Sequence, residues 1–413
     1  MEHKVIYWLW LSLALGAGCK NSSEIIDACD CDAHNLYDDE LFKTTSAKKV
    51  LTTRQIGKLK DKDLTKAKEI SDYCNQNAIK IITPDSQEYP KNLLKISSCP
   101  FVLYLRGNLP SFTENISIAC VGTRKMTEVG KRCAYEFAYD LAKSGIIITS
   151  GMALGIDSIC HRAALDAHGY TVAVLGSGID IVYPPQNEDL YHEICEKGAV
   201  ISEFAPGTPP LGHNFPVRNR IVSGLCAGTL VIEAGERSGS LNTAHHAAEQ
   251  GKDIFSIPGP NGEYNNRGSN SLLKEGAKPV TEAVDIVNFY SERYGSQIKF
   301  NHIQKRKSLQ GLAIPETKSI NSVKKTKNKK IEKEENNLTQ KDEVQACSIS
   351  REELVSLGEP MRSVALSLLD KELFPEEISQ VTNIPFNNVL RAISLLELQG
   401  IVKKISGGKF TIK

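Results

Sequence analysis

The sequence lacks an excess of charge of either sign, and it lacks any paired-cysteine motif. Its 413 residues carry 50 Lys and Arg against 49 Asp and Glu, which gives a formal net charge of +1. A nearly neutral chain does not attract polyanions as a whole, so any nucleic-acid site must be a local basic patch. The 11 cysteines are scattered, no CxxC pair occurs, and Cys29 with Cys31 cannot supply the four ligands of a zinc site. We therefore expect reduced thiols, no metal and no cofactor.

Long apolar runs are also missing. The run VIYWLWLSLALGAG (residues 5–18) resembles an export signal, but it is short for a membrane span and Glu2 stands beside Lys4. Within it, the residues that recur at helical spacing are Trp8, Leu11 and Leu15. We expect a helix that ends at the glycine-rich turn 16–18, and a second helix that begins at Ser22 or Ser23. Together with the scattered thiols, this favours a cytoplasmic protein without a membrane partner.

From Ile116 onward, short apolar segments alternate with amphipathic ones. The apolar segments are ISIACV, IIITSG, TVAVLG, AVIS, TLVIEAG and DIFSIPG. Continuous apolar strands separated by helices indicate parallel strands that are covered on both faces. Because such crossovers are right-handed, the predicted fold class is α/β, with a doubly wound, mostly parallel Rossmann-like sheet.

Two of the helices carry specific expectations. In the segment that follows the first of these strands, the residues Val129, Cys133, Phe137 and Leu141 lie four apart and are expected to share one buried face. A later helix is expected to span residues 217–225 and to begin beside an Arg-Asn-Arg triplet. Cations at a helix N-terminus oppose the macrodipole, so two arginines there suggest a bound anion.

Composition divides the chain into four parts. Residues 1–75 are predicted to form a small helical domain, and residues 76–295 a Rossmann-like domain whose core begins at residue 113. Residues 296–345 are polar and rich in lysine, which is typical of a flexible linker. Residues 346–413 read as three helices and a Gly-Gly hairpin, the order of a winged helix-turn-helix.

Glycines end several of the expected strands, and polar residues stand next to them. The glycines are Gly122, Gly151, Gly176, Gly235 and Gly259, and the polar neighbours include Thr123, Arg124, Ser150 and the triplet Ser238-Gly239-Ser240. Tight βα turns alone explain single glycines. Five at the carboxyl edge of a sheet, among hydroxyl and guanidinium groups, favour an anion-binding site. Ser240 is expected to cap the helix that follows it.

Catalytic motifs are absent. No GxxxxGK[ST] sequence occurs, and GSGIDI lacks the third glycine of a dinucleotide fingerprint. Asp157 and His161 lie four apart without a further ligand or nucleophile at a fixed spacing, and Glu203 and Glu233 form no recognisable acid–base pair. These observations favour binding over catalysis, so we expect a protein that is not an enzyme.

The ordered motifs resemble the DprA/Smf family of DNA-processing proteins. They include VGTRKMTEVG (121–130), SGMALGIDSICHRAAL (150–165), NFPVRNRIVSGL (214–225) and VIEAGERSGSLNTAHHAAEQG (231–251). The resemblance implies single-stranded DNA binding, protection of incoming DNA in natural transformation, and loading of RecA recombinase. It also implies a homodimer formed through the Rossmann-like domain, and a sterile-alpha-motif-like N-terminal module.

The same resemblance implies the residues of the DNA-binding pocket. These are Gly122, Thr123, Arg124, Ser150, Gly151, Arg218, Asn219, Arg220, Ser238, Gly239 and Ser240. Independently of the resemblance, Phe215 stands next to the arginines and is either a platform for a stacked base or a buried core residue. Thr123 replaces the serine that is usual in the family, and Val217 stands where many members have a basic residue.

Two other functions are compatible with parts of the pattern. A Rossmann-like phosphoribohydrolase would cleave nucleotides, but the PGGxGTxxE motif of that class is replaced here by ERSGSLNTA. A transcription regulator would read duplex DNA with the helix PFNNVLRAISLLELQG, where Asn387, Asn388 and Arg391 are the polar candidates.

Overall fold

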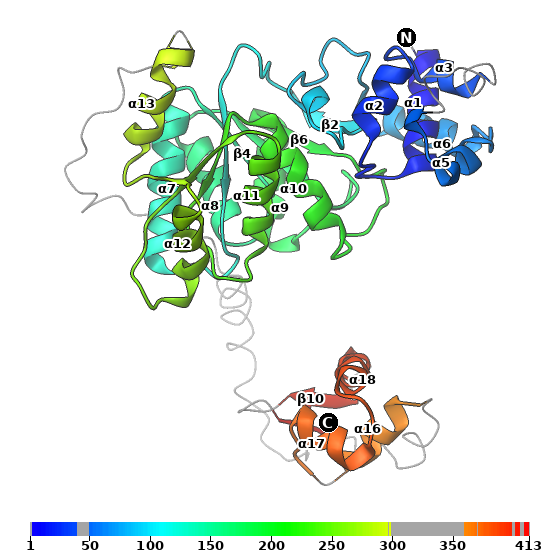
Figure 1. Ribbon diagram of the computed structural model, residues 1–413, viewed down its shortest axis with the longest axis vertical. Coiled ribbons are helices and arrows are strands. Elements are labelled where there is room, and N and C mark those ends of the chain that lie inside the picture. Colours follow the sequence, from blue (N-terminus) through cyan, green and yellow to red (C-terminus); the bar gives the residue numbers. More distant parts are fainter. Residues whose placement is uncertain are drawn as a thin grey trace, which may run out of the picture. The chain divides into compact units, whose positions relative to one another are not determined.

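The computed structural model of the chain describes residues 2–38, 49–295, 297–298, 359–369, 371–398, 401–404 and 409–412 (Figure 1). The chain divides into two compact units, residues 1–316 and residues 317–413. Most of the lysine-rich segment 296–345 falls outside the described residues. The four-part division into domains therefore stays a prediction.

A group of helices precedes the sheet in the first unit. They are α1 (Glu2–Leu15), α2 (Ser22–Ala28), α3 (Ala33–Tyr37), α5 (Thr53–Leu59) and α6 (Thr65–Gln76). Helix α1 packs against α3, α5 and α6, and it buries Trp8 and Leu11 completely. Gly16 follows its last residue with a φ of +82°, which glycine adopts without strain. The predicted end of this helix and the start of the next at Ser22 are confirmed. No helix in the described part of the chain is long and apolar enough to cross a membrane.

The core of the first unit is a large mixed sheet. Its strands are β1 (Lys80–Ile82), β2 (Leu103–Gly107), β3 (Ser117–Val121), β4 (Ile147–Ser150), β5 (Thr171–Leu175), β6 (Ala199–Ser202), β7 (Gly228–Val231), β8 (Asp253–Ser256) and β9 (Lys278–Pro279). Their order in the sheet is β1-β2-β6-β5-β4-β3-β7-β8-β9. In this order, all strands from β6 through β5, β4, β3, β7 and β8 to β9 run parallel to one another. Strand β2 pairs antiparallel with β6, and β1 pairs antiparallel with β2. The predicted α/β class with a mostly parallel sheet is confirmed.

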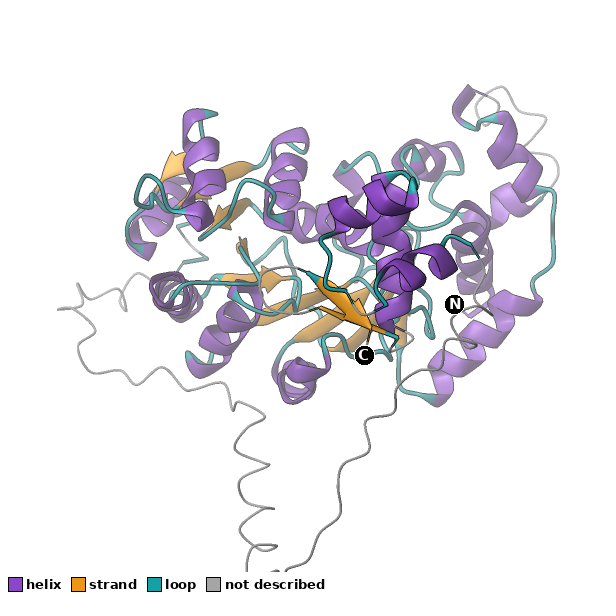
Figure 2. Ribbon diagram, turned by 90° about the horizontal axis from the view of Figure 1, so that it is seen from below, coloured by secondary structure: helices purple, strands orange, loops and turns teal. Residues whose placement is uncertain are grey.

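Helices cover both faces of this sheet (Figure 2). They are α7 (Glu128–Lys143), α8 (Ile156–Asp166), α9 (Glu188–Lys197), α10 (Asn214–Leu225), α11 (Gly239–Glu249), α12 (Arg267–Lys274) and α13 (Ala283–Tyr294). Successive side chains of a strand point to opposite faces. Accordingly, Ile118 and Cys120 of β3 join a core with α7, α8 and α13. Ala119 and Val121 join a second core with α10 and α11. This double burial explains why the strands are mostly apolar on both faces.

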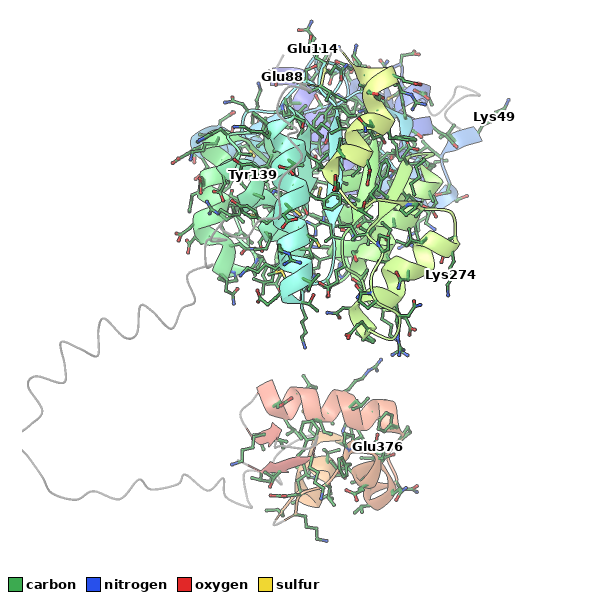
Figure 3. The ribbon with its side chains drawn as sticks, turned by 90° about the vertical axis from the view of Figure 1, so that its left-hand side faces the viewer. Lys49, Glu88, Glu114, Tyr139, Lys274 and Glu376 are labelled. Carbon is green, nitrogen blue, oxygen red and sulfur yellow. The ribbon has the colours of Figure 1, made fainter. Side chains whose placement is uncertain are left out.

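Two local predictions need correction. Phe137 and Leu141 of α7 are buried as predicted, but Cys133 is only partly buried and Val129 is 60% exposed. The helix instead turns Ala134 and Ala138 toward the core, where small side chains let it pack closely on α8. Tyr139 lies on the partly exposed side of α7 (Figure 3). Helix α10 begins at Asn214 rather than at residue 217. Pro216 lies in its first turn, where proline is tolerated because the first N–H groups of a helix need no intrahelical partner.

The described part of the second unit contains α16 (Met361–Ser367), α17 (Pro375–Thr382) and α18 (Phe386–Leu398). The strands β10 (Val402–Lys404) and β11 (Phe410–Ile412) follow as an antiparallel pair. These elements occur in the predicted order, and their buried side chains form a small separate core. The winged-helix assignment itself stays a prediction.

Candidate nucleic-acid interface

A cavity of about 690 Å³ opens at the carboxyl ends of the parallel strands. The chain order reverses between β3 and β7, which are neighbours in the sheet. Ligands of open α/β sheets bind at this kind of topological switch point, where the loops after two adjacent strands diverge. Predicted residues that line the cavity are Gly122, Thr123, Arg124, Gly151, Phe215, Arg218, Asn219, Ser238, Gly239 and Ser240. The topology thus brings most of the predicted site together, and it leaves out Ser150 and Arg220.

Two exposed arginines stand at the cavity. Arg124 follows β3, and its guanidinium lies 5.3 Å from the ring centroid of Phe215. Arg237, in the turn before α11, also lines the cavity and is exposed. Reasoning from the sequence missed Arg237. The signal was its place in the turn GERSGS, directly before the predicted serine cluster. Both side chains are exposed, so a ligand from solution can reach them.

Backbone N–H groups at the strand ends are already engaged. The Thr123 N–H donates to the carbonyl oxygen of Glu233 at 2.7 Å. The Gly151 N–H donates to Oδ2 of Asp157 at 3.2 Å. The sequence suggested that such amides would hold an anion. Because these two donate within the protein, the side chains of the cavity must supply more of any anion binding.

Arg218 is a buried structural cation that also lines the cavity. The residue is 3% exposed, and its Nη1 donates to the carbonyl oxygens of Gly151 and Val174. Its Nε donates to Oδ1 of Asn219 at 3.1 Å. Burial, together with the nearby charge of Arg124, lowers the pKa of Arg218 to about 10, whereas Asp157 opposes this shift. Arg218 therefore fixes the ends of β4 and β5, and it adds positive potential at the cavity floor.

The predicted serines act mainly within the fold. Ser150 is buried, and its hydroxyl donates to the carbonyl oxygen of Cys120 at 2.6 Å. The N-cap of α11 is Ser238 rather than Ser240, since the Ser238 hydroxyl accepts from the Ser240 N–H at 3.4 Å. A cap must precede the first helical residue, and α11 begins at Gly239. The positive end of the α11 macrodipole consequently faces the cavity.

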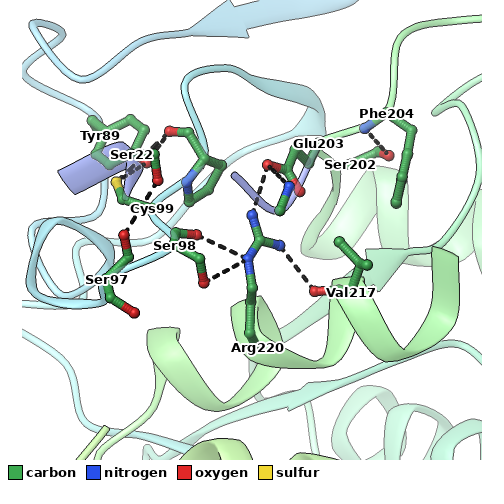
Figure 4. A network of polar contacts seen from close by, with 12 residues as sticks. Ser22, Tyr89, Ser97, Ser98, Cys99, Ser202, Glu203, Phe204, Val217 and Arg220 are labelled. Atoms are coloured by element: carbon green, nitrogen blue, oxygen red, sulfur yellow. Dashed lines mark hydrogen bonds and ion pairs between the residues drawn. The ribbon is translucent and has the colours of Figure 1, made fainter. Parts of the chain in front are cut away.

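Arg220 does not line the cavity, and this corrects its predicted place in the pocket. Its side chain is 4% exposed, and Nη2 donates to Oε1 of Glu203 at 2.7 Å. Its Nε donates to the carbonyl oxygen of Ser98 at 2.8 Å, and Nη1 donates to that of Val217 at 2.9 Å (Figure 4). Oε1 of Glu203 also accepts from the Gly18 N–H at 3.2 Å. Arg220 thus ties α10 to the end of β6 and to the loop before β2, and Glu203 extends this network to the turn after α1.

The carboxylates near the sheet edge are bound in structural roles. Glu203 pairs with Arg220, as described. Oε2 of Glu233 accepts from the N–H and the hydroxyl of Thr127, at 3.0 and 3.3 Å, at the start of α7. No cluster of three or more metal-ligating side chains occurs among the described residues. Both carboxylates are therefore already hydrogen-bonded within the protein.

His161 is a buried neutral histidine on α8. The Thr171 hydroxyl donates its hydrogen to the carbonyl oxygen of Ile148, so it accepts from Nδ1 of His161 at 2.7 Å. Nε2 is buried and has no hydrogen-bond partner among the described residues. Burial, and secondarily the charge of Arg218, lowers the pKa of His161 to about 3. The imidazole is therefore uncharged wherever the protein is folded at ordinary pH.

We expect His161 to weaken the fold at acidic pH. Its pKa is about 3 in the folded chain and about 6.5 in an unfolded one. Between these values the unfolded chain binds the extra proton, so the free energy of unfolding falls as pH decreases, by up to about 1.4 kcal/mol per pH unit. Urea denaturation of wild type and His161→Asn at about pH 7 and about pH 4.5 checks this. Asparagine keeps a donor toward Thr171 but does not titrate in this range, so the stability advantage of wild type over the variant should shrink at the lower pH. A constant difference would contradict the expectation.

Burial has the opposite consequence at Asp157. It raises the pKa of this carboxyl, although Arg218 and the backbone N–H groups of Ala153 and Gly151 oppose the shift. A raised carboxyl pKa lets the folded chain bind a proton first, so it partly offsets the loss due to His161 near pH 4. The comparison with His161→Asn isolates the histidine, because Asp157 is present in both proteins.

The chain matches known proteins over its sheet domain. The family model of DNA recombination-mediator protein A matches residues 80–291, just over half of the chain. Protein Smf of Escherichia coli (strain K12) is 43% identical over 208 residues, which cover 50% of this chain and 55% of that protein. The DNA processing protein DprA of Streptococcus pneumoniae (strain ATCC BAA-255 / R6) is 41% identical over 199 residues, covering 48% and 70% of the two chains.

A solved structure agrees with these matches. The X-ray structure of DNA processing protein A from Streptococcus pneumoniae aligns with a TM-score of 0.58 and 30% identity, over 68% of this chain and 97% of that one. Fold and site define a Rossmann-like α/β protein with a basic cavity at the switch point of its sheet. The chain belongs to the DNA recombination-mediator protein A family, which includes the proteins named DprA and Smf. It spans about half the length of the Escherichia coli relative.

Proposed function

We propose that this protein binds single-stranded DNA at the cavity of its sheet domain. The phosphates contact Arg124 and Arg237, and the N-terminus of α11 adds favourable potential. The single observation that carries the proposal is the pair of exposed guanidinium groups beside a cavity at the switch point. Buried Arg218 makes the electrostatic potential of the cavity more positive without contacting the DNA.

The chemistry of the cavity favours an unpaired strand. Aromatic rings of Phe215, Tyr183 and Tyr264 line the cavity beside the arginines. Such rings stack on the faces of bases, and these faces are accessible in a single strand but are covered by neighbouring pairs in a duplex. Arginine contacts to phosphate carry no sequence information, so the binding is expected to be independent of sequence.

We extend the proposal from binding to recombination. The family description names a recombination mediator, and a protein that holds a single strand is suited to protect incoming DNA and to load RecA recombinase onto it. In this proposal the protein acts in the cytoplasm as a homodimer formed through the Rossmann-like domain. It binds DNA and does not act on it as an enzyme.

A salt titration tests the proposal. The full chain is mixed with an oligothymidylate, and the dissociation constant is measured between about 50 and 200 mM salt. The logarithm of the association constant should fall linearly with the logarithm of salt concentration, by about 0.7 for each phosphate contacted. Duplex of equal length should bind more weakly. Preference for duplex would instead support a transcription regulator, and release of a free base from a nucleotide would support a phosphoribohydrolase.

A further inference from the structure

An exposed tyrosine stands at the β7 side of the cavity. Tyr264 is 57% exposed and lines the cavity, and it belongs to the short turn η4 (Tyr264–Asn266) before α12. Its ring lies against the backbone of Gly235, because a Cβ at that glycine would come within 2.8 Å of the ring atom Cε1. Any other residue at position 235 would therefore push the ring away.

The backbone around Tyr264 is fastened to the rest of the site. The Gly268 N–H donates to the carbonyl oxygen of Ala234 at 2.8 Å, next to the glycine that supports the ring. Nδ2 of Asn265 donates to the carbonyl oxygen of Lys125 at 2.9 Å, in the loop that follows β3. Contacts to the loops after both β7 and β3 thus position a ring whose larger part faces solvent.

The aromatic ring predicted from the sequence is more occupied. Phe215 lies on the other side of the cavity, where a Cβ at Gly176 would come within 2.9 Å of its ring. The Arg124 and Arg218 guanidinium groups lie 5.3 and 5.8 Å from its ring centroid, and the ring of Tyr183 lies at 5.7 Å. Cations and a second ring already surround Phe215, so it has less free surface to offer a base than Tyr264 has.

The sheet order separates the two rings. Gly176 follows β5, and Gly235 lies in the loop after β7. Strands β4 and β3 lie between β5 and β7 in the sheet. Adjacent strands lie about 4.8 Å apart, so the two strand ends are roughly 14 Å apart. A strand of DNA that crosses this edge passes the Gly122–Arg124 turn on its way from one ring to the other.

We infer that Tyr264 is a stacking platform for a nucleobase of the bound strand. This inference rests on the proposed function and adds a base-binding subsite to it. The backbone phosphate beside the base is held at Arg124 or Arg237, while the flat face of the tyrosine covers one face of the base. Stacking needs no particular base edge, so the subsite accepts any of the four bases.

Base-free DNA tests the inference. Affinity is measured for an oligothymidylate and for an oligonucleotide of equal length that has abasic sugars, with wild type, Tyr264→Ala, Tyr264→Leu and Tyr264→Phe. Loss of one stacked base should lower the affinity of Tyr264→Ala for oligothymidylate roughly 10-fold and leave its affinity for the abasic strand unchanged. Tyr264→Phe should bind like wild type. Tyr264→Leu, which keeps an apolar contact with Gly235, should behave like Tyr264→Ala.

The outcomes separate this inference from the proposed function. Tyr73→Ala is the matched control, because Tyr73 on α6 is 39% exposed and does not line the cavity; it should bind like wild type. Equal loss on both strands by Tyr264→Leu would make Tyr264 a structural residue and overturn the inference. Wild-type affinity in Tyr264→Ala would overturn it as well, and the proposed function would stand. If wild type binds neither strand, the proposed function itself fails, and the inference fails with it.

Discussion

Replacement of Arg220 by alanine is expected to destabilise the first unit by about 3–5 kcal/mol. The Arg220 guanidinium and the Glu203 carboxylate are both nearly fully buried, at 4% and 3% side-chain exposure. Oε1 of Glu203 would keep only the Gly18 N–H as a partner, and Oε2 has no partner among the described residues. The substitution therefore leaves a buried carboxylate without its counterion, which costs far more than the loss of an exposed pair.

Urea denaturation measures this loss, and two further variants interpret it. Arg132→Ala is the matched control, because the Arg132 side chain is 60% exposed in its pair with Glu136; its stability should change by no more than about 1 kcal/mol. The double variant Arg220→Met with Glu203→Gln removes both charges and should recover part of the stability lost in Arg220→Ala. A change below about 1 kcal/mol in Arg220→Ala, combined with a large loss of DNA affinity, would contradict the buried role and return Arg220 to the DNA site.

Helical geometry explains why the Arg-Asn-Arg triplet does not act as one motif. Residues two apart on an α-helix point in nearly opposite directions, since each residue advances the helix by about 100°. On α10, Arg218 points toward the cavity floor, whereas Arg220 points toward Glu203 and Ser98. Both residues lie inside the predicted helix 217–225 as well as inside the observed helix, so their opposite directions follow from the sequence prediction itself. The partner Glu203 would not have been visible, because it comes from the end of β6.

The sequence predicts the sheet well because its signal is repeated. Each strand from β3 to β8 is mostly apolar and is followed by a helix, and this pattern identifies a parallel sheet with both faces covered. The strand-end glycines then place most of the cavity, because the carboxyl ends of parallel strands meet at one edge. Nothing in that argument depends on side-chain partners.

Side-chain partners and residues distant in the sequence are harder to predict. Tyr264 enters the cavity from the segment after β8, and its contact with Gly235 has no signature in either local sequence. Engagement of the Gly151 N–H by Asp157 likewise depends on how α8 approaches the end of β4. The candidate cavity could be located from the sequence, whereas the division into structural and ligand-facing arginines required the packed structure.

Removal of both exposed arginines is expected to abolish most of the DNA affinity without affecting the fold. Each charge-assisted contact to phosphate is worth about 1.5–3 kcal/mol. The double variant Arg124→Ala with Arg237→Ala should therefore bind oligothymidylate at least roughly 100-fold more weakly than wild type. Both side chains are exposed, so the urea midpoint should remain that of wild type. Arg220→Ala should give the reverse result: its urea midpoint should fall, and the folded protein should keep its affinity for oligothymidylate.

The salt dependence of binding distinguishes direct contact from long-range attraction. If each arginine neutralises one phosphate, the slope of log K against log salt should decrease by about 0.7 for each arginine removed. Arg267→Ala is the control, because Arg267 is 50% exposed in a pair with Glu236 and does not line the cavity. It removes the same charge nearby, and beyond the Debye length of about 8 Å its effect is largely screened by salt. If Arg267→Ala lowers the affinity and the salt slope as much as Arg124→Ala does, the DNA is attracted by the overall positive charge of this surface. The cavity would then not be its binding site.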